Sequence, residues 1–374
     1  MAVKLNKEQL KNIVYGASFY GGGGGGSMQE GLALIEAMYK EDPKAYIEMI
    51  DIEEMEDDEN IVSTMVAALG SPVATKGRTF QDESVNAVKG MAAEAKFLGK
   101  ELKYVYSGEM GGGNTMLPLY AAWKNGLAII DTDGNGRAVP ELNTGLLPVH
   151  EIPTSPVILA SELGDTIVGR TEDPMDSKAC ENIARYMCQA YNQGIGFAAW
   201  MMNKADHLKA SALGQMSLAE KVGEILRNND AETAFEKMNQ LVAESGRRLN
   251  VFVPSGTIKD ITIDSVGGFD TGVTTIKGDN GKEYKVTFQN ENLFVEEAGG
   301  DVKITVPHII STFELKDGKA VPVSNSETYV GQKVALVSLR AHDRWYDEEE
   351  CYGCWENILI SAGYAMAKPQ VCAD

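Results

Sequence analysis

The residues best suited to chemistry follow two apolar segments near the middle of the chain. Glu109 comes after the segment at 102–106. Asp131 and Asp133 come directly after the segment at 127–130. A carboxylate at the end of a strand can act as a general base, and two aspartates two residues apart can hold a divalent metal ion. The alternative is a turn in which the aspartates bind only their own backbone.

The elements around these carboxylates predict how they are positioned. Residues 116–123 have a helix-like apolar pattern that ends at Gly126, so residues 102–130 form a strand, a helix and a second strand. Parallel strands of such a unit end at the same edge of a sheet, where ligands bind in open α/β folds. We therefore expect the turn after Glu109 and the turn after Asp133 to share one pocket.

Further polar groups and glycines accompany the carboxylates. Glycines that start a helix can present backbone N–H groups to a ligand, as predicted for the tract at 21–26 and for the glycines after Glu109. For the tract at 21–26, the alternative is a flexible hinge. The residues expected to contact a substrate are Gly24, Gly25, Gly112, Gly113, Asn114, Arg137 and Glu141.

Several established motifs are absent. Residues 131–136 resemble the start of a calcium-binding loop, but the twelfth position holds Leu142 instead of glutamate. No serine-hydrolase elbow, phosphate-binding GKS/T loop, zinc-protease HExxH or dinucleotide fingerprint occurs. Cys351 and Cys354 form a CxxC without a second pair to complete a zinc site, which favours a structural or incidental role.

Composition narrows the class of protein. A chain of 374 residues predicts two domains, and a net charge of −20 without a basic patch argues against nucleic acid as a partner. No apolar run is long enough for a membrane span or shaped like a signal peptide, so we expect a cytoplasmic protein. The expected partners are a small-molecule substrate and further copies of the chain in a homo-oligomer.

The order of predicted elements gives the fold class. Strands and helices alternate in residues 1–170, which predicts an α/β domain with a mostly parallel sheet. Residues 171–374 begin with helices that end near Glu244 and continue as short β segments. One hairpin is expected around Asp279-Asn280-Gly281. This second domain is predicted to be β-rich with a helical segment.

Four motifs together resemble one known family. They are the glycine tract at 21–26, ALGSP at 68–72, GEMGGGN at 108–114 and DTDGNGRAVPEL at 131–142. With GFDTGVTTIKG at 268–278 and FQNENL at 288–293, the chain resembles the S-methyl-thiohydantoin desulfurase family over most of its length. One departure is Pro307-His308, where the family pattern expects Pro-Asp, so the role of His308 stays open.

The resemblance implies a hydrolase that replaces the sulfur substituent of a five-membered thiohydantoin ring with oxygen. Glu109, Asp131 and Asp133 would supply the base, or Asp131 and Asp133 would hold a divalent metal ion that activates water. One competing hypothesis is a non-catalytic ligand-binding or regulatory protein on the same scaffold. Another is an oligomeric scaffold in which the glycine-rich edges pack against another subunit.

Overall fold

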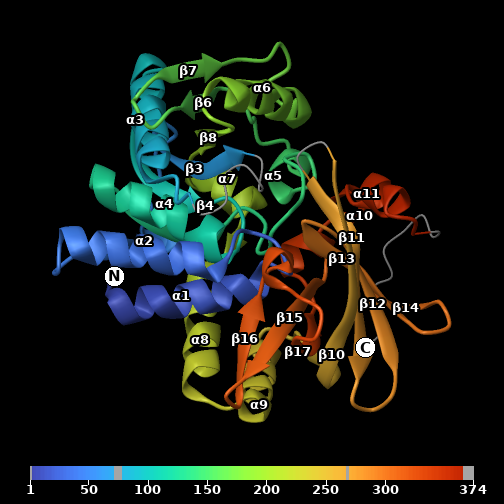
Figure 1. Ribbon diagram of the computed structural model, residues 1–374. Helices are drawn as coiled ribbons and strands as arrows, with labels where there is room; N and C mark the ends of the chain where they lie inside the picture. Colours follow the sequence, from blue (N-terminus) through green and yellow to red (C-terminus); the bar gives the residue numbers. More distant parts are fainter. Residues whose placement is uncertain (1, 71–77, 267–268, 365–374) are drawn as a thin grey trace.

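The computed structural model describes residues 2–70, 78–266 and 269–364, which form two sheets and their helices (Figure 1). The first sheet has the order β1-β2-β5-β4-β3-β8-β6-β7, with β9 paired to β5. The second has the order β14-β13-β12-β11-β10-β17-β15-β16. The predicted α/β domain followed by a β-rich domain is confirmed.

The centre of the first sheet is parallel. Strands β2, β5, β4 and β3 run in one direction, whereas β8 is antiparallel to β3 and β1 is antiparallel to β2. The carboxyl ends of the central strands therefore lie along one edge. The strands are β1 (Val3–Leu5), β2 (Ile47–Ile50), β3 (Ile61–Gly70), β4 (Glu101–Ser107), β5 (Ala128–Asp133), β6 (Val157–Ala160), β7 (Thr166–Gly169), β8 (Gly194–Met202) and β9 (Ala212–Leu213).

Capping residues define where the first helices begin. Asn6 and Ser27 each form a capping box at the start of the following helix, as their types predict. Helices α3 and α4 pack against the central strands, and α6 packs against β3 and β8. The helices before the second sheet are α1 (Lys7–Tyr20), α2 (Met28–Glu41), α3 (Gln81–Phe97), α4 (Gly112–Asn125), α5 (Leu146–Val149), α6 (Ser177–Ala190), α7 (Lys204–Ala210), α8 (Gln215–Asn228) and α9 (Ala231–Ala243).

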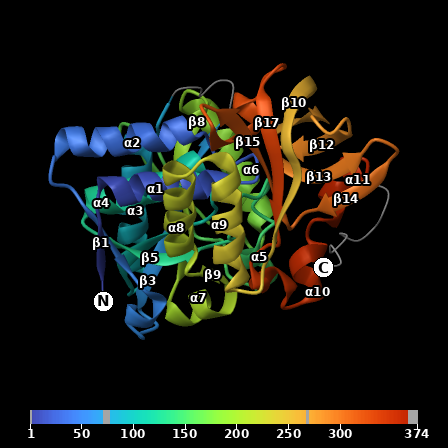
Figure 2. The same ribbon diagram turned by 90° about the horizontal axis from the view of Figure 1, so that it is seen from below.

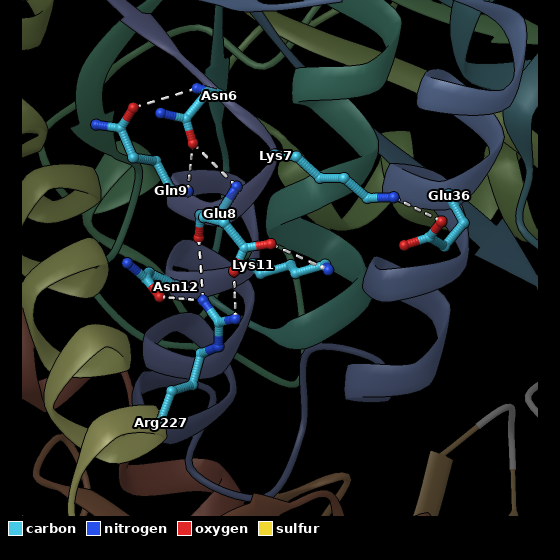
Figure 3. Close-up of polar contacts among 8 residues, drawn as sticks. All are labelled: Asn6, Lys7, Glu8, Gln9, Lys11, Asn12, Glu36 and Arg227. Atoms are coloured by element: carbon cyan, nitrogen blue, oxygen red, sulfur yellow. Dashed lines mark hydrogen bonds and ion pairs between the residues drawn. The ribbon is translucent and has the colours of Figure 1, made fainter. Parts of the chain in front are cut away.

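Helices α1 and α8 lie against each other with almost no space between their backbones. A Cβ atom added to Gly223 would lie 1.8 Å from the carbonyl oxygen of Asn12, and one added to Gly16 would lie 1.9 Å from that of Ala219. At the start of α1, Arg227 of α8 donates hydrogen bonds to Glu8 and Asn12 (Figure 3). This packing fixes α1, whose last residue leads directly into the glycine tract.

The second sheet is antiparallel throughout and shares a hydrophobic core with the first. The expected hairpin is confirmed, since Gly278 and Lys282 are hydrogen-bonded across the turn between β11 and β12. In the core, the ring of Phe313 lies 5.7 Å from that of Phe19. The elements are β10 (Leu249–Val266), β11 (Phe269–Gly278), β12 (Glu283–Gln289), β13 (Glu291–Glu297), β14 (Asp301–Thr305), β15 (Ile309–Lys316), β16 (Lys319–Val323), β17 (Lys333–Leu339), α10 (Glu349–Gly353) and α11 (Glu356–Ser361).

Figure 2 shows that α8 and α9 lie beside each other, with the second sheet beyond them. None of the helices in the described part of the chain combines the length and the apolar character that a membrane crossing requires.

Candidate active site

The turns that follow β4 and β5 are joined to each other by hydrogen bonds. The backbone N–H of Gly134 donates to the carbonyl of Ser107 at 2.8 Å, and the side-chain amide of Asn135 donates to the carbonyl of Gly108 at 2.9 Å. The N–H of Met110 donates to the carbonyl of Arg137. The two turns therefore meet at one sheet edge, as predicted, and a pocket shared between them stays a prediction.

Glu109 bridges the two turns with its carboxylate. One carboxylate oxygen accepts from the backbone N–H of Val139 at 2.9 Å, and the other accepts from the side-chain amide of Asn114. The residue as a whole is half-buried. Burial raises the pKa of Glu109 to about 7, although these hydrogen bonds and the charge of Arg137 act in the opposite direction. Glu109 can therefore both release and accept a proton near neutral pH.

Asp133 is fully buried beside this group. Its Oδ1 accepts from the backbone N–H groups of Asn135 at 2.9 Å and Gly136 at 2.6 Å, which form a tight turn around it. Its Oδ2 has no hydrogen-bond partner among the described residues. Burial raises the pKa of Asp133 to about 7 against the effect of these hydrogen bonds, and the charge of Glu109 makes a smaller contribution in the same direction as burial. The titration of Asp133 is therefore influenced by the charge of Glu109.

Asp131 has a different set of contacts. Both of its carboxylate oxygens are bound by Ser217, one through the backbone N–H at 2.9 Å and one through the hydroxyl. Ser217 is the third residue of α8, whose N-cap position is Gly214 without a capping side chain. Asp131 therefore caps α8 from a distant strand and satisfies backbone groups that the helix itself leaves free.

Arg137 lies buried at the centre of the site, whereas Glu141 faces another element. Arg137 donates to the carbonyls of Pro307 and His308 at 2.7 and 2.8 Å, and its guanidinium lies over the ring of Trp355. Its Nη2 has no partner within the described part of the molecule. The Glu141 carboxylate is paired with Lys178 of α6 at 2.9 Å.

The glycines expected to contact a substrate are packed against one another. A Cβ atom on Gly25 would lie 2.3 Å from the carbonyl oxygen of Met110, and one on Gly111 would lie 2.1 Å from that of Gly25. Likewise, Gly112 packs against the backbone of Met28, and Gly113 against the Glu30 carboxylate. The Asn114 N–H donates to the carbonyl of Gly25 at 3.0 Å. These glycines allow the tract at 21–26 to lie directly on the turn after β4.

The second sheet holds the other side of the glycine tract. The backbone N–H groups of Asn292 and Asn325 donate to the carbonyls of Gly22 and Gly23, each at 2.8 Å. Between them, the carboxyl group of Glu291 lies against Gly24, where an added Cβ atom would come within 1.9 Å of Oε1. The tract is therefore enclosed between the two domains, which leaves no room for it to act as a flexible hinge.

Sequence reasoning did not identify Glu291 as part of this site. It is 3% exposed, its Oε2 lacks a partner in the described structure, and burial together with the charge of Glu109 raises its pKa well above the usual value. The sequence does contain an indication. Glu291 stands between two asparagines directly before the apolar residues 293–295, and a glutamate is rarely buried in such a segment. That indication could not show which residues Glu291 would meet.

His308 and Tyr346 lie near Arg137, which donates to the carbonyl of His308. His308 is 3% exposed, and neither of its ring nitrogens has a partner among the described residues. Burial and the nearby arginines lower the pKa of His308 to about 4, so its ring is neutral at neutral pH. Burial raises the pKa of Tyr346 to about 12, and the two rings are 6.1 Å apart.

The described residues do not fit the predicted metal site. Among them, no three His, Cys, Asp or Glu side chains lie close enough together to hold a metal ion. Ser217 already occupies both oxygens of Asp131, which leaves Asp133 without the predicted second ligand. Cys351 and Cys354 are free thiols, and the Sγ of Cys351 lies 3.6 Å from Nε2 of His150.

Comparison with known proteins gives matches along nearly the whole chain. Residues 8–171 match the family described as S-Me-THD-like, N-terminal domain, and residues 175–352 match S-Me-THD-like, C-terminal domain. A crystal structure of a protein from Chromobacterium violaceum is similar, with a TM-score of 0.82 and 27% identity over 98% of this chain and 99% of that one. No curated protein matches.

Proposed function

The chain belongs to the S-Me-THD-like family, as its motifs predicted, and on this premise we propose that it hydrolyses an S-methyl-thiohydantoin or a closely related hydantoin-like ring. The observation that carries the proposal is the pair of interacting carboxyl groups, Glu109 and Asp133, which both have a pKa of about 7. Such a pair can hold one proton at neutral pH, as acid–base catalysis requires.

The reaction adds water at the ring carbon that carries sulfur. A base removes a proton from the water as its oxygen forms a bond to that carbon, and the electron pair of the ring C=N bond moves onto the nitrogen. The C=N bond re-forms as the carbon–sulfur bond breaks, the leaving sulfur takes a proton from an acid, and the resulting iminol tautomerises to the hydantoin. The products are the hydantoin and methanethiol, so one base and one acid suffice and no redox partner is needed.

The two carboxyl groups differ in ways that assign these roles. Glu109 accepts hydrogen bonds on both oxygens, which favours its ionised form and makes it the base. Asp133 is fully buried with a free Oδ2, and the negative charge of Glu109 favours its protonated form. Asp133 is therefore the acid that returns a proton to the leaving sulfur.

The test is to incubate the purified protein with S-methyl-thiohydantoin and measure both products. A thiol-reactive dye detects methanethiol, and NMR detects the hydantoin. We expect equal amounts of both, and turnover that is unaffected by a metal chelator, because no proposed step uses a metal. Binding of the ring without release of thiol would overturn the hydrolase and favour the alternative of a ligand-binding protein.

A further inference from the structure

Glu291 and Arg137 are two buried ionisable side chains. They lie close together but form no hydrogen bond with each other. Burial raises the pKa of Glu291 and lowers that of Arg137, and the charge of each group acts against the effect of burial on the other, so the two interact electrostatically. Yet the two form no ion pair, and the Oε2 of Glu291 and the Nη2 of Arg137 both lack a partner among the described residues. Buried polar atoms are rarely left without hydrogen bonds, and water, an ion or a ligand can supply the missing partner.

Both groups lie within electrostatic reach of Glu109, the proposed base. Glu291 comes from β13 in the second domain, while Arg137 comes from the turn after β5 in the first. A ligand held between them would lie next to the proposed base and would contact both domains at once.

The glycine tract explains how Glu291 reaches this position. Its Oε1 lies so close to the backbone of Gly24 that any side chain at position 24 would collide with it. Asn292 and Asn325 bind the tract on both sides of this contact, which fixes the path of the chain around Glu291. Such support on both sides is the arrangement expected for a residue that must hold one orientation.

From these contacts we propose that Glu291 is the specificity-determining residue that binds the N–C=O or amidine edge of the ring, with Arg137 beside it. A carboxyl group that carries its proton has a donor and an acceptor on adjacent atoms. The edge of a cyclic amide or amidine has the complementary pair, so two parallel hydrogen bonds form. The Nη2 of Arg137 supplies one more donor for a ring oxygen. The identity of the ring rests on the proposed function.

This assignment predicts which rings the site accepts. A ring with a free N–H next to a carbonyl or imine satisfies both partners, whereas a methyl group on that nitrogen removes the donor and adds bulk. An open-chain carboxylate would place a second negative charge beside the ionised Glu109, in a site from which water is excluded, so it would bind weakly. The preferred substrate is therefore an uncharged five-membered ring with that nitrogen unsubstituted.

The experiment measures binding instead of turnover. Hydantoin, 1-methylhydantoin and 3-methylhydantoin are titrated by calorimetry into the full-length protein and its Glu291→Gln and Glu291→Leu variants. Glu296→Leu, on the same strand but partly exposed, is the matched control. The free energy of unfolding of each variant is measured in urea.

We expect the wild type, Glu291→Gln and Glu296→Leu to bind hydantoin more tightly than at least one methylated ring. Glu291→Leu should lose roughly 10- to 100-fold in affinity for hydantoin and should no longer distinguish that methylated ring. Its stability should be close to that of the wild type, because the variant removes both a buried carboxyl whose Oε2 has no partner among the described residues and the interaction of that carboxyl with Arg137. Lost binding in a stable variant identifies a ligand contact instead of a structural residue.

Two results would overturn the inference. One is a Glu291→Leu protein that keeps both its affinity for hydantoin and its discrimination, and the other is a wild type that binds none of the three rings. If the wild type binds hydantoin as described but releases no thiol from S-methyl-thiohydantoin, the proposed reaction fails while the role of Glu291 in binding stands.

Discussion

Asp131 holds the N-terminus of α8 through Ser217, whose backbone N–H and hydroxyl both donate to its carboxylate. Asp133, two residues later on the same strand, has one oxygen with no partner among the described residues and interacts with Glu109. Two aspartates that look equivalent in the sequence therefore have different surroundings. We assign Asp131 to stability and Asp133 to chemistry.

Replacing Asp131 with alanine should lower stability without abolishing turnover. Loss of a helix cap costs about 1 kcal/mol in the free energy of unfolding, which urea titration can measure. Ser217→Ala, which removes only the hydroxyl, should have a smaller effect in the same direction. An Asp131→Ala protein of normal stability but without activity would show that Asp131 belongs to the catalytic group after all.

Replacing Glu109 with glutamine should remove the base and preserve the fold. The glutamine oxygen can still accept from Val139, and the Asn114 amide can turn its oxygen toward the new NH2 group, so the thermal midpoint should change little, while kcat should fall by about 100- to 10,000-fold. Glu56→Gln, at an exposed position paired with Lys103, is the charge-matched control. A Glu109→Gln protein with the kcat of the wild type would remove Glu109 from the mechanism.

Activity should be highest near neutral pH and fall on both sides. The base must be ionised, so the rate falls as the pH drops below about 7, and the acid must be protonated, so the rate falls above about 7. The pKa values read from the acidic and alkaline sides of the pH–rate profile belong to Glu109 and Asp133 together and not to either residue alone. In Asp133→Asn the residual rate should lose its alkaline limb. A wild-type rate that is flat from about pH 5 to 9 would contradict the assignment.

Stability should respond to pH through Asp133 in a direction opposite to that of a salt-bridged aspartate. Its pKa rises from 3.8 to about 7 on folding, so the folded state binds the proton more tightly. The resulting stabilisation is complete below pH 3.8 and is lost as the pH rises to about 7. Asparagine cannot ionise, so Asp133→Asn should gain in relative stability between pH 5 and pH 8. Urea titrations at the two pH values measure the difference in the free energy of unfolding between the variant and the wild type. The same difference at both pH values would refute this.

Sequence patterns predicted the local features of the fold and the meeting of the two turns. Asn6 and Ser27 cap their helices through contacts within three residues, and strands of one βαβ unit end at a common edge for topological reasons. The roles of Asp131 and Arg137 could not be predicted in this way. Their partners, Ser217 and Pro307, lie 86 and 170 residues away and are brought close only by the complete fold.

The glycines give a similar lesson. A glycine-rich turn before a helix suggests backbone N–H groups for a ligand, and the same sequence suits two backbones in direct contact. Only the structure shows that Gly25 and Gly111 touch each other and that Gly24 touches Glu291. The sequence shows that these glycines have no side chains. It does not show whether a ligand, another backbone or a side chain such as Glu291 fills the space.

Substitution of Gly24 should disturb Glu291 directly. A Cβ atom at position 24 would overlap Oε1, so Gly24→Ala should displace that side chain, weaken hydantoin binding and cost about 1–3 kcal/mol of stability. Gly353→Ala is the control, because no atom lies within 4 Å of its added Cβ, and it should leave both unchanged or slightly raise stability. Normal hydantoin binding by Gly24→Ala would show that the contact is not restrictive.

Strand β8 has a consequence for how this protein can be divided. It lies beyond residue 171, where the match to the first family domain ends, yet it pairs with β3 and β6 inside the first sheet. A fragment that stops at 171 would expose the edges of both strands and invite aggregation. A polypeptide cut between residues 171 and 175 should regain its native structure only when the two halves are refolded together.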